Sequence, residues 1–387
     1  MFDRQQDRQP YVTVGTTSPI YIPRGPETKA VRPGESYFVV RIKGAQAAFS
    51  GPLWEKARRL IVTSQVSLNH PLLGPEPLQA IQRSREVHKG RAEQLGLSPN
   101  LINLVPATMD HVSISLEFIV DKENRLAALG GLINDDAFIT AISLAPGAAA
   151  AARTIGTLAD KILQTFLEPE ERQPILAFSG DFNIATGDLR DGYYVILGTR
   201  DERNPLPRPL PTLEVQDGDL LADGRPVTQW SYVILDVRCL EVRTRDLNEG
   251  AGWAEKLRRA EGVAQRLGGD PFVGEEERRQ AWRECTNLLK EAQVLLMEDP
   301  TYLRREAQDI IQEAYLRCRE QIFGTDVGGI AFDLPGTPKG PMRGEADTPS
   351  DRAFLGIPPE EDLHASVRRY TAQVSEARRL LREAGLL

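Results

Sequence analysis

Four polar residues of this chain have types and positions that suit hydrolytic chemistry. Asp181 and Asn183 follow an apolar segment at residues 175–178, and Asp110 and His111 precede a segment in which apolar and polar residues alternate. A carboxylate and an amide at the end of a strand can hold a divalent cation and a phosphate group, while a histidine beside an aspartate can move a proton. One candidate reaction is therefore the metal-dependent cleavage of a phosphodiester.

The tetrapeptide Gly-Asp-Phe-Asn at residues 180–183 resembles a signature of the metal-dependent endonuclease/exonuclease/phosphatase family. In that family the aspartate and the asparagine hold and orient the scissile phosphate and its nucleophile. The resemblance therefore implies catalytic roles for Asp181 and Asn183, with Asp110 and His111 as helpers. The family also uses an upstream glutamate and a late Asp-His pair, whereas Asp110-His111 precedes the tetrapeptide here. The alternative is a turn with a side-chain cap at the end of a strand.

A calcium site is a second possibility for the same acidic loops. Oxygen ligands could come from Asp181, Asn183, Asp188 and Asp191, at one end of a β-sandwich. An EF-hand is excluded, because counting from Asp181 places Thr186 at the required glycine and Gly192 at the required glutamate. Acidic residues in ordinary polar turns are the competing explanation.

Other common catalytic and cofactor motifs are absent from the sequence. There is no GxSxG, P-loop or GxGxxG motif, and the four histidines show no HxH or HExxH spacing. We therefore expect no cofactor, and the enzyme interpretation depends on the tetrapeptide alone.

Composition describes an ordinary globular protein. The 387 residues are 41% hydrophobic and 26% charged, with a formal net charge of −8. No basic region favours a nucleic-acid partner, and no apolar run of about 18 residues favours a membrane partner. The N-terminus lacks a secretory signal, and Cys239, Cys285 and Cys318 form no CxxC pair, which favours reduced thiols in a cytoplasmic protein. Arginine heavily outnumbers lysine, as is typical of GC-rich bacterial genomes.

The pattern of apolar residues and prolines predicts five parts and an α+β fold. Strand signals begin after a proline-rich arm and recur without regular βαβ alternation, which favours an antiparallel sheet or sandwich. Residues 76–95 read as a helix within this domain. The predicted parts are an extended arm (1–34), an α+β sheet domain (35–247), a helical region with a helical hairpin (248–323), a Gly/Pro-rich linker (324–359) and a terminal amphipathic helix (360–387).

The terminal helix carries a heptad pattern, with alternating spacings of four and three residues. Its apolar positions are Leu363, Val367, Tyr370, Val374, Ala377, Leu381 and Ala384. Such a stripe keeps one line of side chains facing a partner helix. Three partners fit it: the helical hairpin of the same chain, another protein or identical subunit, or a membrane surface.

From these patterns we predict a non-catalytic protein-interaction or scaffold subunit of a cytoplasmic bacterial assembly. The predicted partner-binding residues are Leu363, Val367, Tyr370, Val374 and Leu381, because large apolar groups dominate such contacts. The alternatives are a metal-dependent phosphodiesterase and a calcium-binding sandwich domain.

Overall fold

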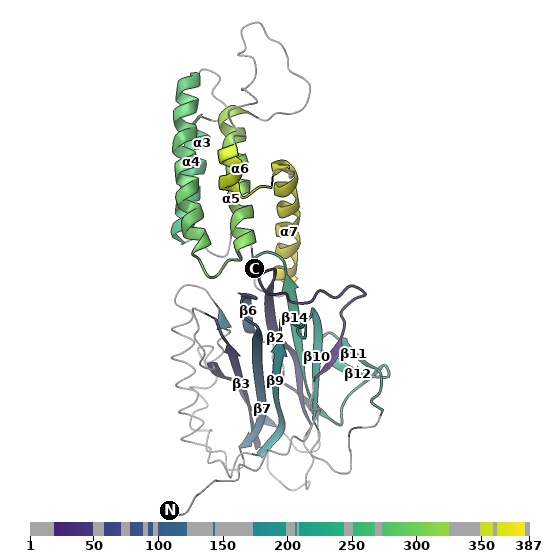
Figure 1. Cartoon of the computed structure of the whole chain (residues 1–387). Coiled ribbons are helices and arrows are strands. Elements are labelled where there is room, and N and C mark those ends of the chain that lie inside the picture. Colours follow the sequence, from purple (N-terminus) through teal and green to yellow (C-terminus); the bar gives the residue numbers. More distant parts are fainter. Residues whose placement is uncertain are drawn as a thin grey trace, which may run out of the picture. The chain divides into compact units, whose positions relative to one another are not determined.

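A computed structural model describes the chain at residues 19–48, 58–70, 78–87, 92–95, 100–121, 142–143, 173–198, 206, 209–243, 251–267, 273–324, 349–358 and 362–383 (Figure 1). The chain divides into two compact units, Met1–Cys239 and Leu240–Leu387. The first contains the strands and the second contains the helices, so the predicted α+β class is confirmed.

Two antiparallel sheets form most of the first unit, and a small third sheet lies beside them. The strands are β1 (Ile20–Ile22), β2 (Tyr37–Ala48), β3 (Arg58–Leu68), β4 (Leu78–Val87), β5 (Ala92–Gln94), β6 (Asn100–Pro106), β7 (His111–Asp121), β8 (Ile142–Ser143), β9 (Gln173–Asn183), β10 (Gly192–Gly198), β11 (Leu213–Gln216), β12 (Asp219–Ala222), β13 (Arg225–Pro226) and β14 (Ser231–Leu240). The larger sheet has the order β1-β10-β14-β2-β6-β8, with β5 also paired to β2, and the second has the order β4-β3-β7-β9. Strands β6 and β8 pair in parallel, whereas β10 pairs with β14, β3 with β7 and β7 with β9 in antiparallel fashion.

The core of the first unit lies between these two sheets. Val40 of β2 and Val62 of β3 belong to one buried cluster, and so do alternate residues of β7 from Val112 to Phe118. The alternation predicted for residues 112–120 therefore marks a strand with one buried face. The opposite faces of β10 and β14 carry a second cluster, in which Tyr232 contacts the small β11-β12-β13 sheet through Leu220.

Two turns of the small sheet have the backbone that their sequences predict. Asp217 and Asp223 have φ values of 51° and 49°, and each is followed by a glycine with positive φ. Asp-Gly is favoured where both central residues of a hairpin turn are left-handed. Both aspartates are therefore turn residues.

The helix predicted for residues 76–95 is wrong. Leu78–Val87 is strand β4, which pairs with β3, and Ala92–Gln94 is strand β5. The β3-β4 pairing shifts register between Val62 and Thr63. A register shift of this kind is typical of a β-bulge, which interrupts the two-residue pattern by which a strand is recognised in a sequence.

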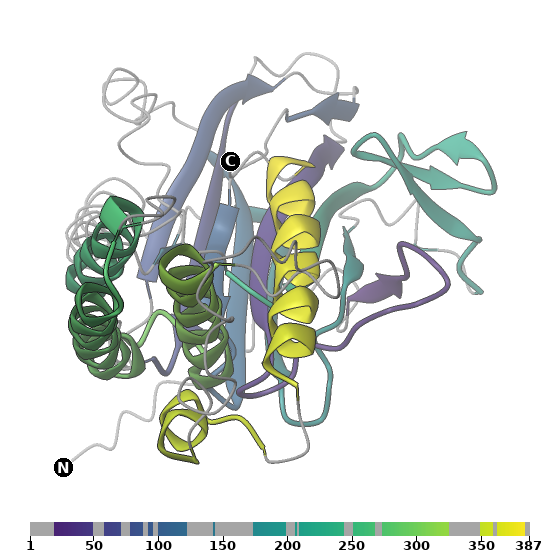
Figure 2. The same ribbon diagram turned by 90° about the horizontal axis from the view of Figure 1, so that it is seen from above.

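The second unit contains α3 (Gly252–Leu267), α4 (Glu275–Met297), α5 (Arg304–Phe323), α6 (Pro349–Leu355) and α7 (Leu363–Glu383). Helix α5 contacts α3, α4, α6 and α7, so it is the centre of this unit (Figure 2). The predicted hairpin is α4 and α5. In the turn between them, the Asp299 carboxylate accepts hydrogen bonds from the main-chain N–H and the hydroxyl of Thr301.

Two boundaries differ from those predicted. The sheet unit ends at Cys239 rather than at residue 247, and α6 lies inside the range predicted as a linker. Helix α6 is held by the side chains of α4 and α5: Gln293 donates to the carbonyl of Phe354, and Gln312 donates to that of Leu355. Seven residues separate Leu355 from Leu363, so α6 and α7 form one C-terminal arm, residues 349–383.

Candidate functional site

The antiparallel pairing of β7 and β9 brings the predicted catalytic residues to one strand end. His111 lies opposite Asn183, and Ser113 lies opposite Asp181. The Asp181 carboxylate accepts a hydrogen bond of 2.9 Å from the Ser113 hydroxyl and lies 3.7 Å from Nδ1 of His111. The His111 and Asp181 side chains are 56% and 63% exposed. Water therefore screens this pair strongly, and it lacks the buried environment that tunes catalytic groups.

Asn183 and Asp188 shape the turn that follows β9. The Asn183 side-chain oxygen accepts a hydrogen bond from the main-chain N–H of Thr186. The Asp188 carboxylate accepts hydrogen bonds from the main-chain N–H of Asn183 and from the Thr186 hydroxyl. These bonds are typical of Asx turns, so both side chains are occupied in local structure.

The other candidate residues at this end of the unit have separate roles. Asp191 pairs with Arg24, and the main-chain carbonyl of Asp110 accepts from the N–H of Ile184. Within the ranges that the structure describes, no three His, Cys, Asp or Glu side chains gather where one cation could join them. Among the described residues, the structure brings His111 to Asp181, and the phosphodiesterase and calcium interpretations stay predictions.

The predicted partner-binding residues lie on α7, and three of the five are buried. Leu363, Tyr370 and Leu381 are 8%, 1% and 1% exposed, whereas Val367 and Val374 are partly exposed. Ser366, at 3% exposed, takes the buried position next to Val367, so the buried line is rotated slightly from the predicted heptad. Helix α7 contacts α5 of its own chain, which is one of the three partners that fit the pattern.

Polar contacts set the position of α7 on α5. The Ser366 hydroxyl donates a hydrogen bond of 2.8 Å to the side-chain oxygen of Gln312, and both residues are buried. Farther along, Gln373 of α7 donates to the Glu241 carboxylate, which lies in the segment that precedes the helices. The main-chain N–H of Arg243 in that segment donates to both carboxylate oxygens of buried Glu306 on α5. The buried Ser366–Gln312 pair favours a single register of α7 on α5, as buried polar groups do in helix pairs.

Tyr370 is the largest side chain on the α7 stripe, and its hydroxyl is buried. Among the residues that the structure describes, nothing accepts or donates a hydrogen bond at this hydroxyl. Burial, followed by the charges of Glu306 and Glu313, raises the pKa of Tyr370. The docked arm therefore contains one polar group whose interaction with water is lost without replacement.

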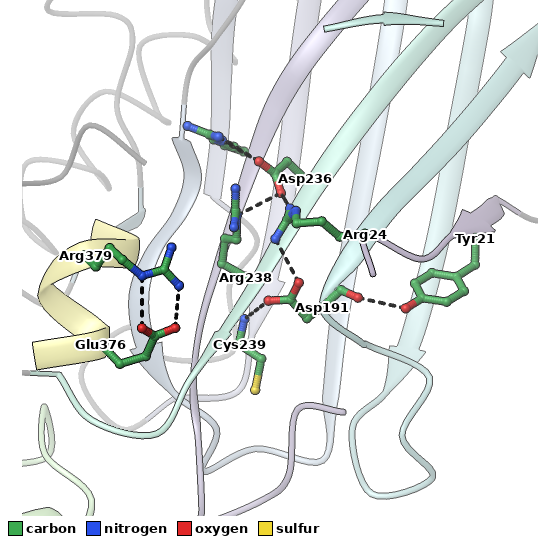
Figure 3. A network of polar contacts seen from close by, with 9 residues as sticks. Tyr21, Arg24, Asp191, Asp236, Arg238, Cys239, Glu376 and Arg379 are labelled. Carbon is green, nitrogen blue, oxygen red and sulfur yellow. Dashed lines mark hydrogen bonds and ion pairs between the residues drawn. The ribbon is translucent and has the colours of Figure 1, made fainter. Parts of the chain in front are cut away.

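A network of arginines and aspartates in the first unit was not predicted from the sequence. Asp236 of β14 is fully buried, and its carboxylate contacts Arg24, Arg41 and Arg238. Arg24 lies between Asp236 and Asp191 (Figure 3). The sequence feature that could have indicated this network is a pair of charged residues, at positions 236 and 238, in the otherwise apolar stretch of residues 232–240.

Two buried thiols face each other across the α4-α5 hairpin. Cys285 and Cys318 are each fully buried, and the thiol of Cys285 donates a hydrogen bond to the carbonyl of Ala260. The hydrogen bond between the two thiols, together with burial, raises the pKa of Cys318, and the same bond lowers the pKa of Cys285. Neither of them, nor Cys239, forms a disulfide bond within the described residues.

Comparison with known proteins adds no functional information, because no family model, curated protein or solved structure matches the chain. None of the helices in the described ranges is long and apolar enough to span a bilayer.

Proposed function

We propose that this chain is a non-catalytic protein-interaction subunit whose C-terminal arm is the binding element. The observation that supports this proposal is the way α7 is held. Its buried stripe lies on α5, yet in sequence α7 follows α5 only after a Gly- and Pro-rich stretch and the short helix α6. A surface that receives a helix from a distant part of its own chain offers the same contacts to the same helix of another copy.

The partner we infer is a second copy of this chain, which exchanges arms. In such an exchange α7 of one copy packs on α5 of the other, and the Ser366–Gln312 hydrogen bond forms between chains instead of within one. Exchange makes no new kind of contact, so its free energy is set mainly by concentration and by the entropy of the connecting segment. Another protein with a heptad-patterned helix would use the same face of α5.

The Tyr370 hydroxyl favours release of the arm. A buried hydroxyl without a hydrogen-bond partner costs about 1–3 kcal/mol relative to its hydrated state. This penalty lowers the stability of the docked arm without removing the apolar contacts that any partner would also make. A partner that places an acceptor beside Tyr370 would gain an advantage over the chain's own α5. We place this subunit in a cytoplasmic bacterial assembly, as its composition predicts.

Light-scattering molar mass tests the proposal. The full-length protein is unfolded, refolded at high and at low concentration, and measured against two variants, Tyr370→Asp and Thr371→Asp. Thr371 is exposed on α7 one residue from Tyr370, so it controls for the introduced charge. We expect a dimer fraction that grows with refolding concentration in the wild type and in Thr371→Asp, and its loss in Tyr370→Asp. Monomers of equal mass at every concentration, with no partner retained from an extract, would show that α7 serves only its own chain.

A further inference from the structure

The arginine-aspartate network contains more positive than negative charge. Its members are Arg24, Arg41, Arg238, Asp191 and Asp236. In the part of the chain that the structure describes, the three guanidinium groups and two carboxylates of this network leave one positive charge, and arginine stays protonated in proteins at neutral pH. Because the Asp236 carboxylate is fully buried and the three arginine side chains are 11–22% exposed, little water is available to screen that charge.

The oxygens of both aspartates are already in use. One oxygen of Asp236 accepts from Arg24, and the other accepts from Nε of Arg41 at 2.8 Å. One oxygen of Asp191 accepts from Arg24 at 2.8 Å, and the other accepts from the main-chain N–H of Cys239 at 3.2 Å. The two carboxylates thus pair with Arg24 and Arg41 and hold them in place, although Nε of Arg24 is buried without a hydrogen-bond partner among the described residues.

Arg238 is the member of the network without a counter-ion of its own. Its ion pair is a 3.4 Å approach of Nε to the Asp236 oxygen that Arg24 already occupies. Its guanidinium makes no hydrogen bond with the part of the chain that the structure describes, and its Nε is buried. Burial, together with the neighbouring charges of Arg24 and Arg41, lowers the pKa of Arg238. For Arg24, burial also acts to lower the pKa, but the charges of Asp236 and Asp191 outweigh it and the pKa is raised.

We propose that Arg238, held beside Arg24 and Arg41, is a binding site for one carboxylate group. Core residues Val237 and Cys239 alternate with Asp236 and Arg238 along β14, so the guanidinium lies on the face of the large sheet away from the sandwich core. Its side chain is 12% exposed, so part of it reaches solvent. The planar guanidinium fork matches a carboxylate through two parallel hydrogen bonds. A carboxylate carries one negative charge and brings the network to neutrality, whereas a phosphate dianion would leave it negative.

Thermal unfolding of the full chain in sodium acetate tests this site. Sodium chloride at equal ionic strength separates specific binding from screening. For the wild type we expect a saturable rise in melting temperature with acetate beyond that with chloride. In Arg238→Gln we expect a higher melting temperature without acetate, because the unbalanced charge is gone, and loss of the acetate response. Arg225→Gln is the matched control, since Arg225 is an exposed arginine of β13 in the same unit.

Two further probes identify the source of the carboxylate. A blocked Gly-Glu-Gly peptide that stabilises the protein at concentrations about tenfold below acetate indicates an acidic side chain of a protein partner, and equal potency indicates a small carboxylic acid. The site is disproved if acetate acts equally on the wild type and Arg238→Gln, or if acetate acts no more than chloride. A response to inorganic phosphate without a response to acetate would overturn the assignment to a carboxylate.

Discussion

The Ser366 hydroxyl on α7 donates a buried hydrogen bond of 2.8 Å to the side-chain oxygen of Gln312 on α5. The amide nitrogen of the same Gln312 donates at 2.9 Å to the carbonyl of Leu355, at the end of α6. One glutamine of α5 therefore contacts both helices of the C-terminal arm. Because a buried polar pair is satisfied in one register only, Gln312 specifies where the arm docks.

Removal of this glutamine should destabilise the arm more than removal of its partner. We expect Gln312→Ala to lower the free energy of unfolding by about 2–3 kcal/mol, because it removes the donor to the Leu355 carbonyl and the acceptor of the Ser366 hydroxyl. We expect Ser366→Ala to lower it by about 1 kcal/mol. Urea denaturation of both variants and the double variant gives the coupling between them. A coupling of about 1 kcal/mol is expected, and strictly additive losses would contradict the hydrogen bond.

Gly356 tests the docking of α6. It has a φ of 62°, and a Cβ placed there would lie 2.5 Å from the amide nitrogen of Gln308 on α5. Gly356→Ala should therefore lower the free energy of unfolding by about 1–2 kcal/mol, because alanine is strained in a left-handed backbone. Displacement of the Gln308 side chain should lower it further. Gly324→Ala is the control, because Gly324 has a φ of 89° with nothing within 4 Å of its Cβ position. Hydrogen exchange in residues 349–383 should quicken in the Gly356 variant alone, and equal behaviour would mean that α6 is not packed as described.

Tyr194 should give the first unit a dependence on alkaline pH. Its hydroxyl donates to the carbonyl of Asp188 and accepts from the N–H of Arg190, and burial raises the pKa of Tyr194 to about 12. Between pH 10 and 12 the unfolded chain loses this proton first, so the free energy of unfolding falls as pH rises. Tyr194→Phe should lower the free energy of unfolding by about 1–3 kcal/mol at pH 7. It should also weaken the decrease of that free energy between pH 10 and 12. Chemical denaturation at several pH values measures both, and equal alkaline slopes in the two proteins would contradict this role for Tyr194.

The three cysteines should be unreactive in the folded protein. Cys239 is 5% exposed, and Cys285 and Cys318 are fully buried. Because thiol reagents need an accessible thiolate, we expect Ellman's reagent to label none of the three in native buffer and all of them in concentrated urea. Rapid labelling without urea would show that the α4-α5 hairpin opens readily.

The strand end at which β7 begins and β9 finishes should tolerate substitution. Asp181→Asn changes an exposed carboxylate that lies 3.7 Å from His111, and exposed contacts of this kind are worth under about 1 kcal/mol, so the free energy of unfolding should hardly change. Calcium, manganese and a chelator should leave the melting temperature of the wild type unchanged. Metal-dependent stabilisation that Asp181→Asn abolishes would revive the metal-site interpretation of this loop.

The sequence predicted an element correctly where the pattern of apolar residues within that element was sufficient to define it. The alternation along β7 and the heptad of α7 are periodic within one element, so both predicted their element correctly. Strand β4 was missed because its pairing with β3, which includes a register shift, defines it and no local pattern does. Helix α6 was missed because its short apolar segment lies in a Gly- and Pro-rich region, and contacts with α4 and α5 decide its structure.

The same contrast between local patterns and long-range contacts applies to the two candidate sites, the arginine-aspartate network and the Asp181–Asn183 motif. Nothing local indicates that Arg24, Arg41 and Arg238 meet at Asp236, because strand pairing brings them together from distant parts of the chain. Conversely, Asp181 and Asn183 formed a recognisable local motif, but cross-strand contacts and an Asx turn occupy their side chains. Long-range topology thus created one candidate site and gave structural roles to the residues of another.

Binding of the arm as a separate peptide tests the central proposal most directly. A fluorescent peptide of residues 349–387 is titrated with the full-length protein, and its anisotropy is followed to equilibrium. We predict slow, saturable binding, limited by release of the protein's own arm, that is lost when the peptide carries Tyr370→Asp and kept when it carries Thr371→Asp. Absence of binding by the wild-type peptide at every concentration, with the protein folded, would contradict an exchangeable arm and make α7 a permanent part of its own helical unit.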